Sequence, residues 1–379
     1  MKITKVEVLR VKTNRPSWRP IFCRIHTDEG IYGDGEAAMA YDAGAPAAYA
    51  MIKDLAPTLI GMDPMQIEWI WETFFRTTFW GLNAGPVMYS AMSAIDIALW
   101  DIKGKALNTP VYNLLGGKCR DKVRAYIGIR GQSPEEAAEN ALFRVEQGYT
   151  VLRMCMDQAE RGIYEPGKIV RRSAAYLEAV RRAVGEDVEL IFECHTRYTP
   201  VRAVELAQAV APYHPLFIED AIRADSPEAY RHLRRHSNVP LGTSEKLGAI
   251  WDYKALIEED LIDYLRPDIC NCGGISSMRK IAAYGEAHYL ELVPHGVPHV
   301  GFLANLHADF SIPNFYCQED WLSDSHPDCL DYDVTLKDGF LIMGDRPGLG
   351  ITVDESALLP YESYEHPHWR REDGTVQDW

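Results

Sequence analysis

Three short stretches set the architecture of this chain: VELIFECH (188–195), PLFIED (215–220) and PLGTSE (240–245). Each is an apolar run of the kind found in buried strands, and a segment with helical periodicity follows it. Each run closes on an acidic residue, Glu193, Glu219 or Glu245, and the glutamates are 26 residues apart both times. Three successive β/α units of equal length would project these strand-end carboxylates toward one point.

Carboxylates that converge in this way repel one another unless a cation neutralises them. Oxygen ligands suit a hard divalent ion, and Mg²⁺ is the usual occupant of such a site. The spacing therefore predicts a Mg²⁺ site whose ligands are Glu193, Glu219 and Glu245.

The same alternation of strands and helices extends in both directions, from about residue 122 to residue 330. Eight strand-like runs occur in this region: VRAYIGI, TVLRMCM, VELIFECH, LFIED, LGTSE, YLRPD, LELVPH and FYCQE. Eight parallel strands with intervening helices close into a (β/α)8 TIM barrel, in which catalytic groups sit at the carboxyl ends of the strands. The expected fold class is α/β, with the candidate ligands at the catalytic end of a C-terminal barrel.

The flanking regions follow other patterns. Residues 1–121 begin with three alternating strand-like runs and continue with helices, the clearest of which covers about residues 85–106. This order predicts an α+β capping domain. Residues 331–379 contain strand-like and turn-rich pieces, and we expect this segment to pack back on the capping domain and complete it.

Composition narrows the classes of partner. The chain has 379 residues and a formal net charge of −16, which argues against nucleic acid and anionic membrane surfaces. No apolar run is long enough for a transmembrane helix, and the first residues follow a strand pattern that does not fit a signal peptide. The eight cysteines are scattered, which suggests reduced thiols and a cytoplasmic location.

Acid–base groups flank the predicted metal site. Glu193 and His195 are two residues apart on one strand, so both side chains point to the same face. Asp268 and His295 end the sixth and seventh strands, which are neighbours in a barrel. A carboxylate beside an imidazole fixes its tautomer and raises its basicity, so this pair is a predicted general base.

The third and seventh strands are opposite each other in a ring of eight, so we expect His195 and His295 to face each other across the site. One histidine can then take a proton while the other gives one. With a metal between them, these groups suit β-elimination from a carboxylate that has an acidic α-hydrogen and a β-hydroxyl. Metal and nearby cations would stabilise the charge that develops.

These features carry a resemblance to a known family. The chain resembles the mandelate racemase branch of the enolase superfamily, and within it the acid-sugar dehydratases, particularly galactonate dehydratase. The similarity covers nearly the whole chain. It rests on the spaced glutamates and on the segments GPVMYSAMSAIDIALWDIKGKALNTPVYNLLGG, ECHTR, RPDICNCGGISSMRKIAA, LVPHG, NFYCQE, PGLGITVDE and HPHWRREDGTVQDW.

The resemblance implies a Mg²⁺-dependent hydro-lyase, a carbon–oxygen lyase that dehydrates a sugar acid, namely an aldonate such as galactonate. It implies that His295 with Asp268 removes the C2 proton and that His195 assists loss of the C3 hydroxyl, which gives a 2-keto-3-deoxy sugar acid. Glu319 becomes a polar partner near the substrate carboxylate. The family also implies a homo-oligomer, either a dimer or an octamer.

The chain departs from the family pattern in the metal site and on the second strand. The first ligand in the family is usually Asp, and this chain has Glu193, which is one methylene longer. The strand of the second ligand usually ends Glu-Glu-Pro, and here Asp220 and Ala221 follow the glutamate. Racemases carry a lysine pair on the second strand, where this chain has Arg153 and Cys155. Arginine stays protonated, so two-base racemisation through that position is disfavoured.

Five residues are candidate substrate contacts. Arg153 is a candidate for the substrate carboxylate or a hydroxyl, and Arg197 belongs to the strand-end signature that contains His195. In the family, an N-terminal loop closes over the barrel mouth, which adds Trp18 and Arg19. His299 lies in the loop after the predicted base.

Two other functions stay open. A sugar-acid epimerase or racemase would use the opposed histidines to deliver a proton to the other face of the intermediate. The second alternative is a barrel that binds metal and ligand with weak or no turnover, which the departures at Glu193 and at Asp220-Ala221 motivate.

Overall fold

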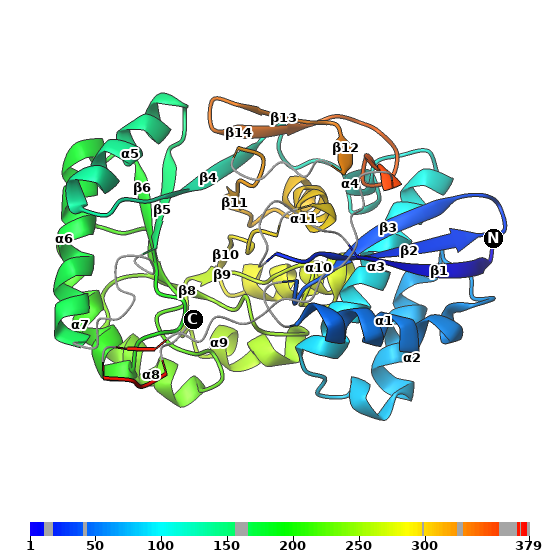
Figure 1. The fold of residues 1–379 in the computed structure, drawn as a ribbon, viewed down its shortest axis with the longest axis horizontal. Coiled ribbons are helices and arrows are strands. Elements are labelled where there is room, and N and C mark those ends of the chain that lie inside the picture. The colour runs from blue at the N-terminus through cyan, green and yellow to red at the C-terminus, as the bar shows by residue number, and fades with distance from the viewer. Residues whose placement is uncertain are drawn as a thin grey trace.

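The computed structural model describes residues 1–10, 18–40, 44–155, 166–297, 299–323, 329–355, 370–371 and 373–376. Figure 1 shows two regions, an N-terminal sheet with its helices on the right and a ring of strands surrounded by helices on the left. The predicted fold class, a TIM barrel with an α+β capping domain, is confirmed.

The capping domain begins with the antiparallel sheet predicted from the sequence: β1 (Ile3–Arg10), β2 (Ile21–Thr27) and β3 (Tyr32–Ala37). Its helical elements are α1 (Ala45–Leu59), α2 (Ile67–Thr77), the 3-10 turn η1 (Phe79–Gly81), α3 (Pro86–Ala106) and α4 (Val111–Leu114). The helix predicted over residues 85–106 is α3, which begins at the first-turn proline expected of a helix start.

Two glycines allow α3 to lie directly on β3. A Cβ atom on Gly35 would lie 1.9 Å from the carbonyl oxygen of Ala94, and Gly33 meets the helix in the same way. A larger residue would push the helix away from the sheet. On its other side α3 contacts the barrel, where Nε1 of Trp100 donates to Oγ of Ser276 at 2.9 Å. Helix α3 therefore joins the capping sheet to the barrel.

The barrel contains all eight predicted strands: β4 (Val123–Ile129), β5 (Val151–Cys155), β6 (Glu189–Glu193), β7 (Phe217–Glu219), β8 (Leu241–Thr243), β9 (Tyr264–Leu265), β10 (Glu291–Leu292) and β11 (Gln318–Glu319). Consecutive strands from β4 to β10 pair in parallel, and β11 pairs with β4. A parallel bridge between Leu292 and Phe315 joins β10 to the start of the last strand segment. The ring is closed, so the strand ends carrying the glutamates share one face.

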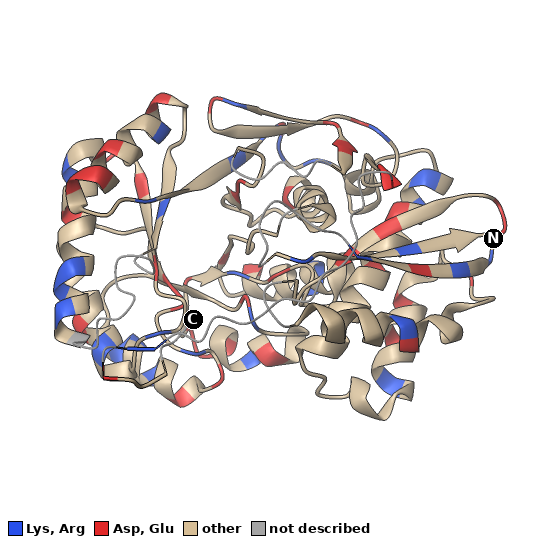
Figure 2. Cartoon of the chain, in the orientation of Figure 1, with Lys and Arg blue, Asp and Glu red and all other residues tan. Residues whose placement is uncertain are grey.

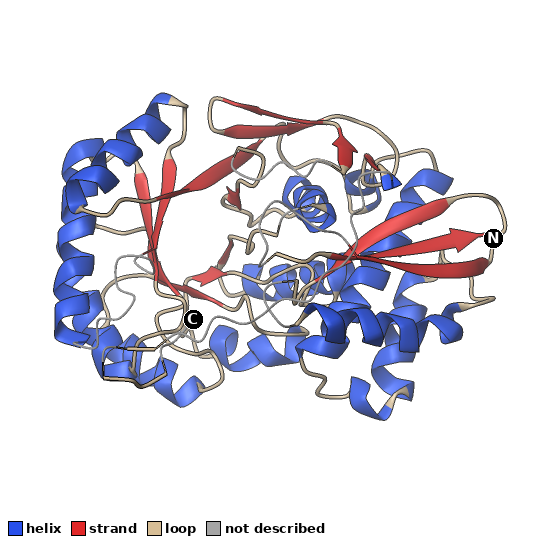
Figure 3. Cartoon of the chain, viewed as in Figure 1, coloured by secondary structure: helices blue, strands red, loops and turns tan. Residues whose placement is uncertain are grey.

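Helices cover the outside of this ring (Figure 3). They are α5 (Pro134–Glu146), α6 (Pro166–Val184), α7 (Pro200–Val210), α8 (Pro227–His236), α9 (Lys254–Glu258), α10 (Gly274–Glu286) and α11 (Val300–Ser311), with 3-10 turns η2 (Ala211–Tyr213) and η3 (Ile250–Tyr253). Ser133 and Ser226 cap α5 and α8, and their side chains accept backbone hydrogen bonds from Glu136 and Ala229. Both helices begin with the sequence Ser-Pro-Glu, in which serine is a favoured N-cap and proline a favoured first helical residue.

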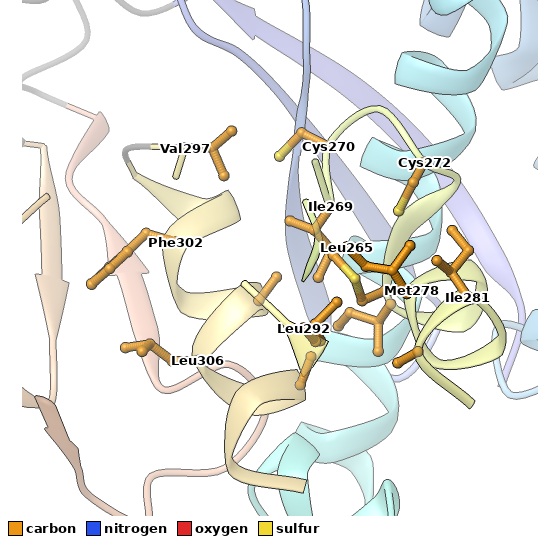
Figure 4. Close-up of a cluster of buried hydrophobic side chains, with 14 of the residues drawn as sticks. Leu265, Ile269, Cys270, Cys272, Met278, Ile281, Leu292, Val297, Phe302 and Leu306 are labelled. Atoms are coloured by element: carbon orange, nitrogen blue, oxygen red, sulfur yellow. The ribbon is translucent and has the colours of Figure 1, made fainter. Parts of the chain in front are cut away.

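One hydrophobic core extends from the capping domain through the barrel. Figure 4 draws a part in which side chains of β9 and β10 pack with those of α10 and α11. Its labelled members are Leu265, Ile269, Cys270, Cys272, Met278, Ile281, Leu292, Val297, Phe302 and Leu306. Cys270 and Cys272, which are two residues apart, are buried thiols that pack in this core.

The C-terminal segment touches both regions. It contains β12 (Leu330–Tyr332), β13 (Val334–Lys337), β14 (Phe340–Met343) and β15 (Ile351–Val353), and β14 pairs antiparallel with β4 of the barrel. Toward the capping domain, Leu349 N–H donates to Asp101 at 2.8 Å, and Glu355 pairs with Arg24. Most of the chain after residue 355 lies outside the described residues. The predicted boundaries at residues 121 and 330 stay predictions.

Charge on the described surface is mixed. Figure 2 shows basic and acidic residues interspersed along the outer helices of the barrel. Within the described residues, none of the helices combines the length and the apolar character that a membrane crossing requires.

Candidate active site

The three spaced glutamates come together at one end of the barrel. Glu193 and Glu219 end β6 and β7 and pair in the strand register, and Glu245 follows β8 by two residues. Each offers one carboxylate oxygen, and these oxygens lie within 4.8 Å of one another. Glu193 and Glu219 are buried, and Glu245 is half-buried.

The charges of this cluster fit a bound cation. Burial and the neighbouring Glu219 raise the pKa of Glu193 well above its usual value. Neither carboxylate oxygen of Glu219 accepts a hydrogen bond from the described residues, although the group is fully buried. Buried acids that share one site are costly, and a divalent ion with oxygen ligands lowers that cost. The cluster can therefore hold a metal ion.

Two arginines also meet the cluster. Arg153 on β5 places Nη1 3.3 Å from Glu193 and 3.6 Å from Glu219, and Arg266 forms a buried ion pair with Glu219. Burial opposes ionisation of Glu219, but the two guanidinium groups outweigh it and lower its pKa to about 2. The arginines thus neutralise part of the negative charge in the absence of a cation.

A strained turn presents His195 beside the cluster. His195 and Thr196 both have positive φ, 47° and 62°, which is unusual for residues with a Cβ and most of all for a β-branched one. The turn is held to the next strand, because Thr196 N–H donates to Asp220 O at 2.6 Å. His195 N–H also donates to Glu193 at 2.6 Å. Strain of this kind persists where surrounding contacts impose it, and it is common at functional sites.

The ring of His195 lies between the cluster and β5. Nε2 is 3.8 Å from Oε2 of Glu193, and Nδ1 is 3.4 Å from the thiol sulfur of Cys155. Burial lowers the pKa of His195 to about 4; Arg153 and Arg197 add to this effect, and Glu245 opposes it.

His295 and Asp268 form the predicted pair. Nδ1 of His295 donates to Oδ2 of Asp268 across 3.0 Å, and Nε2 lies 3.5 Å from Glu245. The other oxygen of Asp268 accepts from Cys270 N–H at 2.7 Å, which fixes the carboxylate. Burial alone would lower the pKa of His295, but Glu245 and Asp268 raise it to about 9. The two histidines thus reach the cluster beside different glutamates.

Glu319 ends β11 next to this pair. Its Oε2 accepts from Gly296 N–H at 3.0 Å and from the Tyr126 hydroxyl at 3.1 Å, and its Oε1 lies 2.8 Å from Nη2 of Arg153. Burial disfavours the charged form of Glu319, but the positive charges of Arg153, His295 and Arg266 together outweigh burial and lower the pKa.

The structure describes the surroundings of four further predicted substrate contacts. Arg197 is half-buried, two residues after His195. The ring of Trp18 lies 5.6 Å from that of Trp321, which follows β11, so this pair connects the N-terminal region to the barrel. Arg19 is buried, and its backbone N–H donates to Ala40 at 2.7 Å. The fourth, His299, is buried, with Nδ1 3.5 Å from Glu36 of β3 and its ring against Phe22 of β2.

Sequence reasoning did not identify Arg266 and Tyr126. Nη2 of Arg266 donates to the Tyr126 hydroxyl at 3.0 Å, and Nη1 donates to Val293 O at 3.0 Å. Together they connect Glu219 to Glu319 inside the barrel. The sequence did contain an indication of Arg266. It lies two residues before Asp268 in the run YLRPD, and side chains two residues apart on a strand point to the same face.

A closed α/β barrel with a capping domain and a carboxylate cluster at its strand ends defines a barrel enzyme of the enolase type. The family models agree. The mandelate racemase / muconate lactonizing enzyme N-terminal domain matches residues 8–116, and the enolase C-terminal domain-like region matches residues 136–357. The chain belongs to the mandelate racemase / muconate lactonizing enzyme family of the enolase superfamily.

Individual relatives match over their full length. The chain is 35% identical to a D-mannonate dehydratase from Caulobacter vibrioides, over 99% of this chain and 100% of the relative. It is 34% identical to a D-galactonate dehydratase from Ralstonia pickettii, over 100% of both. An enolase from Pantoea ananatis, solved with bound D-gluconate and magnesium, superposes with a TM-score of 0.90 at 32% identity, covering 99% of each chain. The predicted class, a hydro-lyase among the acid-sugar dehydratases, is confirmed.

Proposed function

We propose that this protein dehydrates a sugar acid in a Mg²⁺-dependent reaction. The observation that carries the proposal is the arrangement of two imidazoles, His295 with Asp268 and His195, around the cluster of Glu193, Glu219 and Glu245. The three glutamates would hold the ion. When bound, Mg²⁺ supplies positive charge for the negative charge that develops on the substrate carboxyl group.

His295 is the proposed base. Asp268 accepts from Nδ1, which leaves Nε2 facing the cluster as the atom that takes the C2 proton. The electron pair of the broken C2–H bond first moves onto the substrate carboxyl group, and it then forms the C2–C3 double bond as the C3–O bond breaks. His195 gives the departing hydroxyl a proton, so that it leaves as water. These roles require a protonated His195 and a neutral His295 in the loaded site, which is the reverse of the order of their pKa values in the protein without metal and substrate. The enol that remains tautomerises to a 2-keto-3-deoxy sugar acid. Because the histidines approach from different glutamates, we propose an anti elimination.

The substrate would be an aldonate such as galactonate. The similarity to a mannonate and to a galactonate dehydratase, and to an enolase that binds gluconate, supports this substrate class. We assign contacts with its carboxylate and hydroxyl groups to Arg153, Arg197 and Glu319, and contacts at the rim of the barrel to Trp18, Arg19 and His299. Positive side chains beside the site would offset the repulsion between an anionic substrate and this acidic chain.

Screening with an aldonate and aldarate library tests the function. With Mg²⁺ present, at least one member should give a semicarbazide-reactive 2-keto acid, and chelation by EDTA should stop the reaction until Mg²⁺ is restored. No product from any member would favour the alternative of a metal-binding barrel with weak or no turnover.

A sugar-acid epimerase or racemase is the second candidate, because His195 and His295 could serve the two faces of one carbon. Incubation in D₂O followed by NMR separates the two. An epimerase exchanges the C2 hydrogen and keeps the β-hydroxyl, whereas a dehydratase yields the keto acid.

We further propose a cytoplasmic homo-oligomer, a dimer or an octamer. All eight cysteines are reduced thiols in the structure, as is usual in a reducing compartment. Size-exclusion chromatography with light scattering would give the mass, and a monomer at micromolar concentration would contradict the assembly.

A further inference from the structure

The end of β3 in the capping domain reaches the two loops that carry the proposed base. Oε2 of Glu36 accepts a hydrogen bond from Gly301 N–H at 2.9 Å, in the first turn of α11. Oε1 of the same buried carboxyl lies 3.5 Å from Nδ1 of His299. Two residues further along the chain, Ala38 N–H donates to Cys270 O at 3.0 Å. The capping strand is therefore bonded to the loop after Asp268 and to the helix after His295.

From these loops the contacts continue to the base itself. Cys270 N–H donates to Asp268 Oδ1 at 2.7 Å, and Asp268 Oδ2 holds His295 at 3.0 Å. The start of α11 packs closely against both loops, because a Cβ atom on Gly301 would lie 2.4 Å from Cys270 Sγ and 2.5 Å from Val297 Cγ2. A shift of α11 would therefore move Cys270 or the His295 loop, and with it the spacing of the pair.

A buried carboxyl needs compensation, since burial raises the pKa of Glu36 and disfavours its charge. The helix start supplies it, because the free N–H groups and the dipole of a helix N-terminus favour an acceptor there. The same contacts fix where α11 begins relative to the capping sheet. His299 at the N-cap position has φ 75°, a conformation that its contacts with Glu36 and Phe22 help to hold.

We propose that Glu36 is a positioning residue for the base: it holds the start of α11 against the loop after Asp268 and thereby sets the geometry of the Asp268–His295 pair. The capping domain then contributes to proton abstraction as well as covering the barrel. The inference rests on the proposed role of His295.

Two variants of Glu36 separate positioning from charge. Glu36→Leu keeps the approximate volume and removes both acceptors, and Glu36→Gln keeps a carbonyl oxygen for Gly301 N–H. We expect the Leu variant to lose about tenfold or more in kcat on the sugar acid, with KM within about twofold, because small displacements of reacting groups are costly. We expect the Gln variant to stay within about threefold of wild type.

A second measurement does not depend on turnover. In metal-free protein labelled with ¹⁵N-histidine, the Nδ1–H proton of His295 that is bonded to Asp268 should give a downfield NMR signal, assigned by its loss in His295→Asn. We expect Glu36→Leu to shift or broaden this signal and Glu36→Gln to keep it. If no sugar acid is dehydrated, the proposed function fails while this signal still tests Glu36.

Asp101→Asn is the matched control. Asp101 is also a buried acid of the capping domain; it accepts from Asp34 N–H at 3.0 Å and from Leu349 N–H at 2.8 Å, and so holds the C-terminal segment. This variant should keep the His295 signal and kcat. If Glu36→Leu does not fold, Glu36→Asp, which draws the carboxylate back by one methylene, decides the question through the same signal. A folded Leu or Asp variant with the wild-type signal and kcat, or an equal loss in Asp101→Asn, would overturn the proposal.

Discussion

Arg153 of β5 and Glu319 of β11 form a largely buried ion pair inside the barrel, with one strand between them and 2.8 Å between Nη2 and Oε1. The other terminal nitrogen of the same guanidinium lies 3.3 Å from Glu193. One side chain thus neutralises both a proposed metal ligand and a proposed substrate contact. The charge of Arg153 should therefore contribute most to the free energy of unfolding when no cation is bound.

Replacing Arg153 by Met tests this relationship. The variant leaves Glu193 and Glu319 without their shared cation, and loss of one partner from a buried pair costs about 3–5 kcal/mol. We expect that loss in the free energy of unfolding, measured by urea titration in EDTA, and a smaller loss in Mg²⁺, because the ion neutralises the glutamates. Arg346→Met, which breaks the exposed pair with Asp331, should cost about 1 kcal/mol or less in both conditions. Equal losses of Arg153→Met with and without Mg²⁺ would show that the cation does not compete for the same charges.

Replacing Glu219 by Gln tests the metal site. An amide keeps the shape of the side chain and removes one ligand charge. Loss of a group that only hydrogen-bonds to a metal ligand lowers metal affinity by ~10–100-fold. Calorimetric titration of Glu219→Gln with Mg²⁺ should therefore show an affinity lowered by at least that factor. Glu189→Gln serves as the control, since it lies at the opposite end of β6. Unchanged binding in Glu219→Gln would remove this residue from the ligand set.

We expect the buried imidazole of His307 to lower the free energy of unfolding in acid. It is fully buried, Nδ1 accepts from Tyr112 N–H at 3.1 Å, and burial lowers its pKa to about 4. Above about pH 6.5 the ring is neutral in both the folded and the unfolded chain, so stability is complete. As the pH falls from about 6.5 toward 4, the unfolded chain binds a proton that the folded one excludes, which costs up to about 3 kcal/mol.

His307→Asn should remove that part of the pH dependence, because an amide oxygen can accept from Tyr112 without titrating. Denaturant unfolding at several pH values measures the difference between the two curves. His214→Asn, at an exposed position where φ is 45° and Asn is well tolerated, should keep the wild-type slope. The same slope in His307→Asn and wild type would refute the assignment.

Gly296 should tolerate no side chain. A Cβ atom there would lie 2.1 Å from Trp321 Nε1 and 2.6 Å from Glu319 Oε2, directly after the proposed base. We expect Gly296→Ala to lower kcat by about tenfold or more through displacement of these groups. Gly128→Ala on β4 is the control, because a Cβ atom there meets nothing within 4 Å. Equal activity of both variants would mean that Trp321 and Glu319 can move to make room for the methyl group without lowering kcat.

The barrel and its glutamate cluster were predictable because each depends on a local pattern. An apolar run followed by an acid marks a buried strand end, and equal spacing places Glu193 beside Glu219 in the strand register. The strands β9 and β10 are shorter than the predicted runs. Pro267 and Pro294 follow them, and proline cannot donate a hydrogen bond to a neighbouring strand.

The interior network was not predictable, because it depends on which inward-facing side chains meet across the ring. Arg266 and Tyr126 are 140 residues apart in sequence and share one hydrogen bond. The position of His299 against Glu36 likewise depends on how the capping sheet docks on the barrel. Local periodicity carries no information about either contact.

The fate of the C2 hydrogen tests the central claim most directly. In D₂O with Mg²⁺ and the active sugar acid, NMR should show neither C2 exchange nor keto acid for His295→Asn. For His195→Asn it should show C2 exchange without dehydration, since the proposed base is intact and the proposed acid is missing. Dehydration at the wild-type rate by both variants would contradict the account.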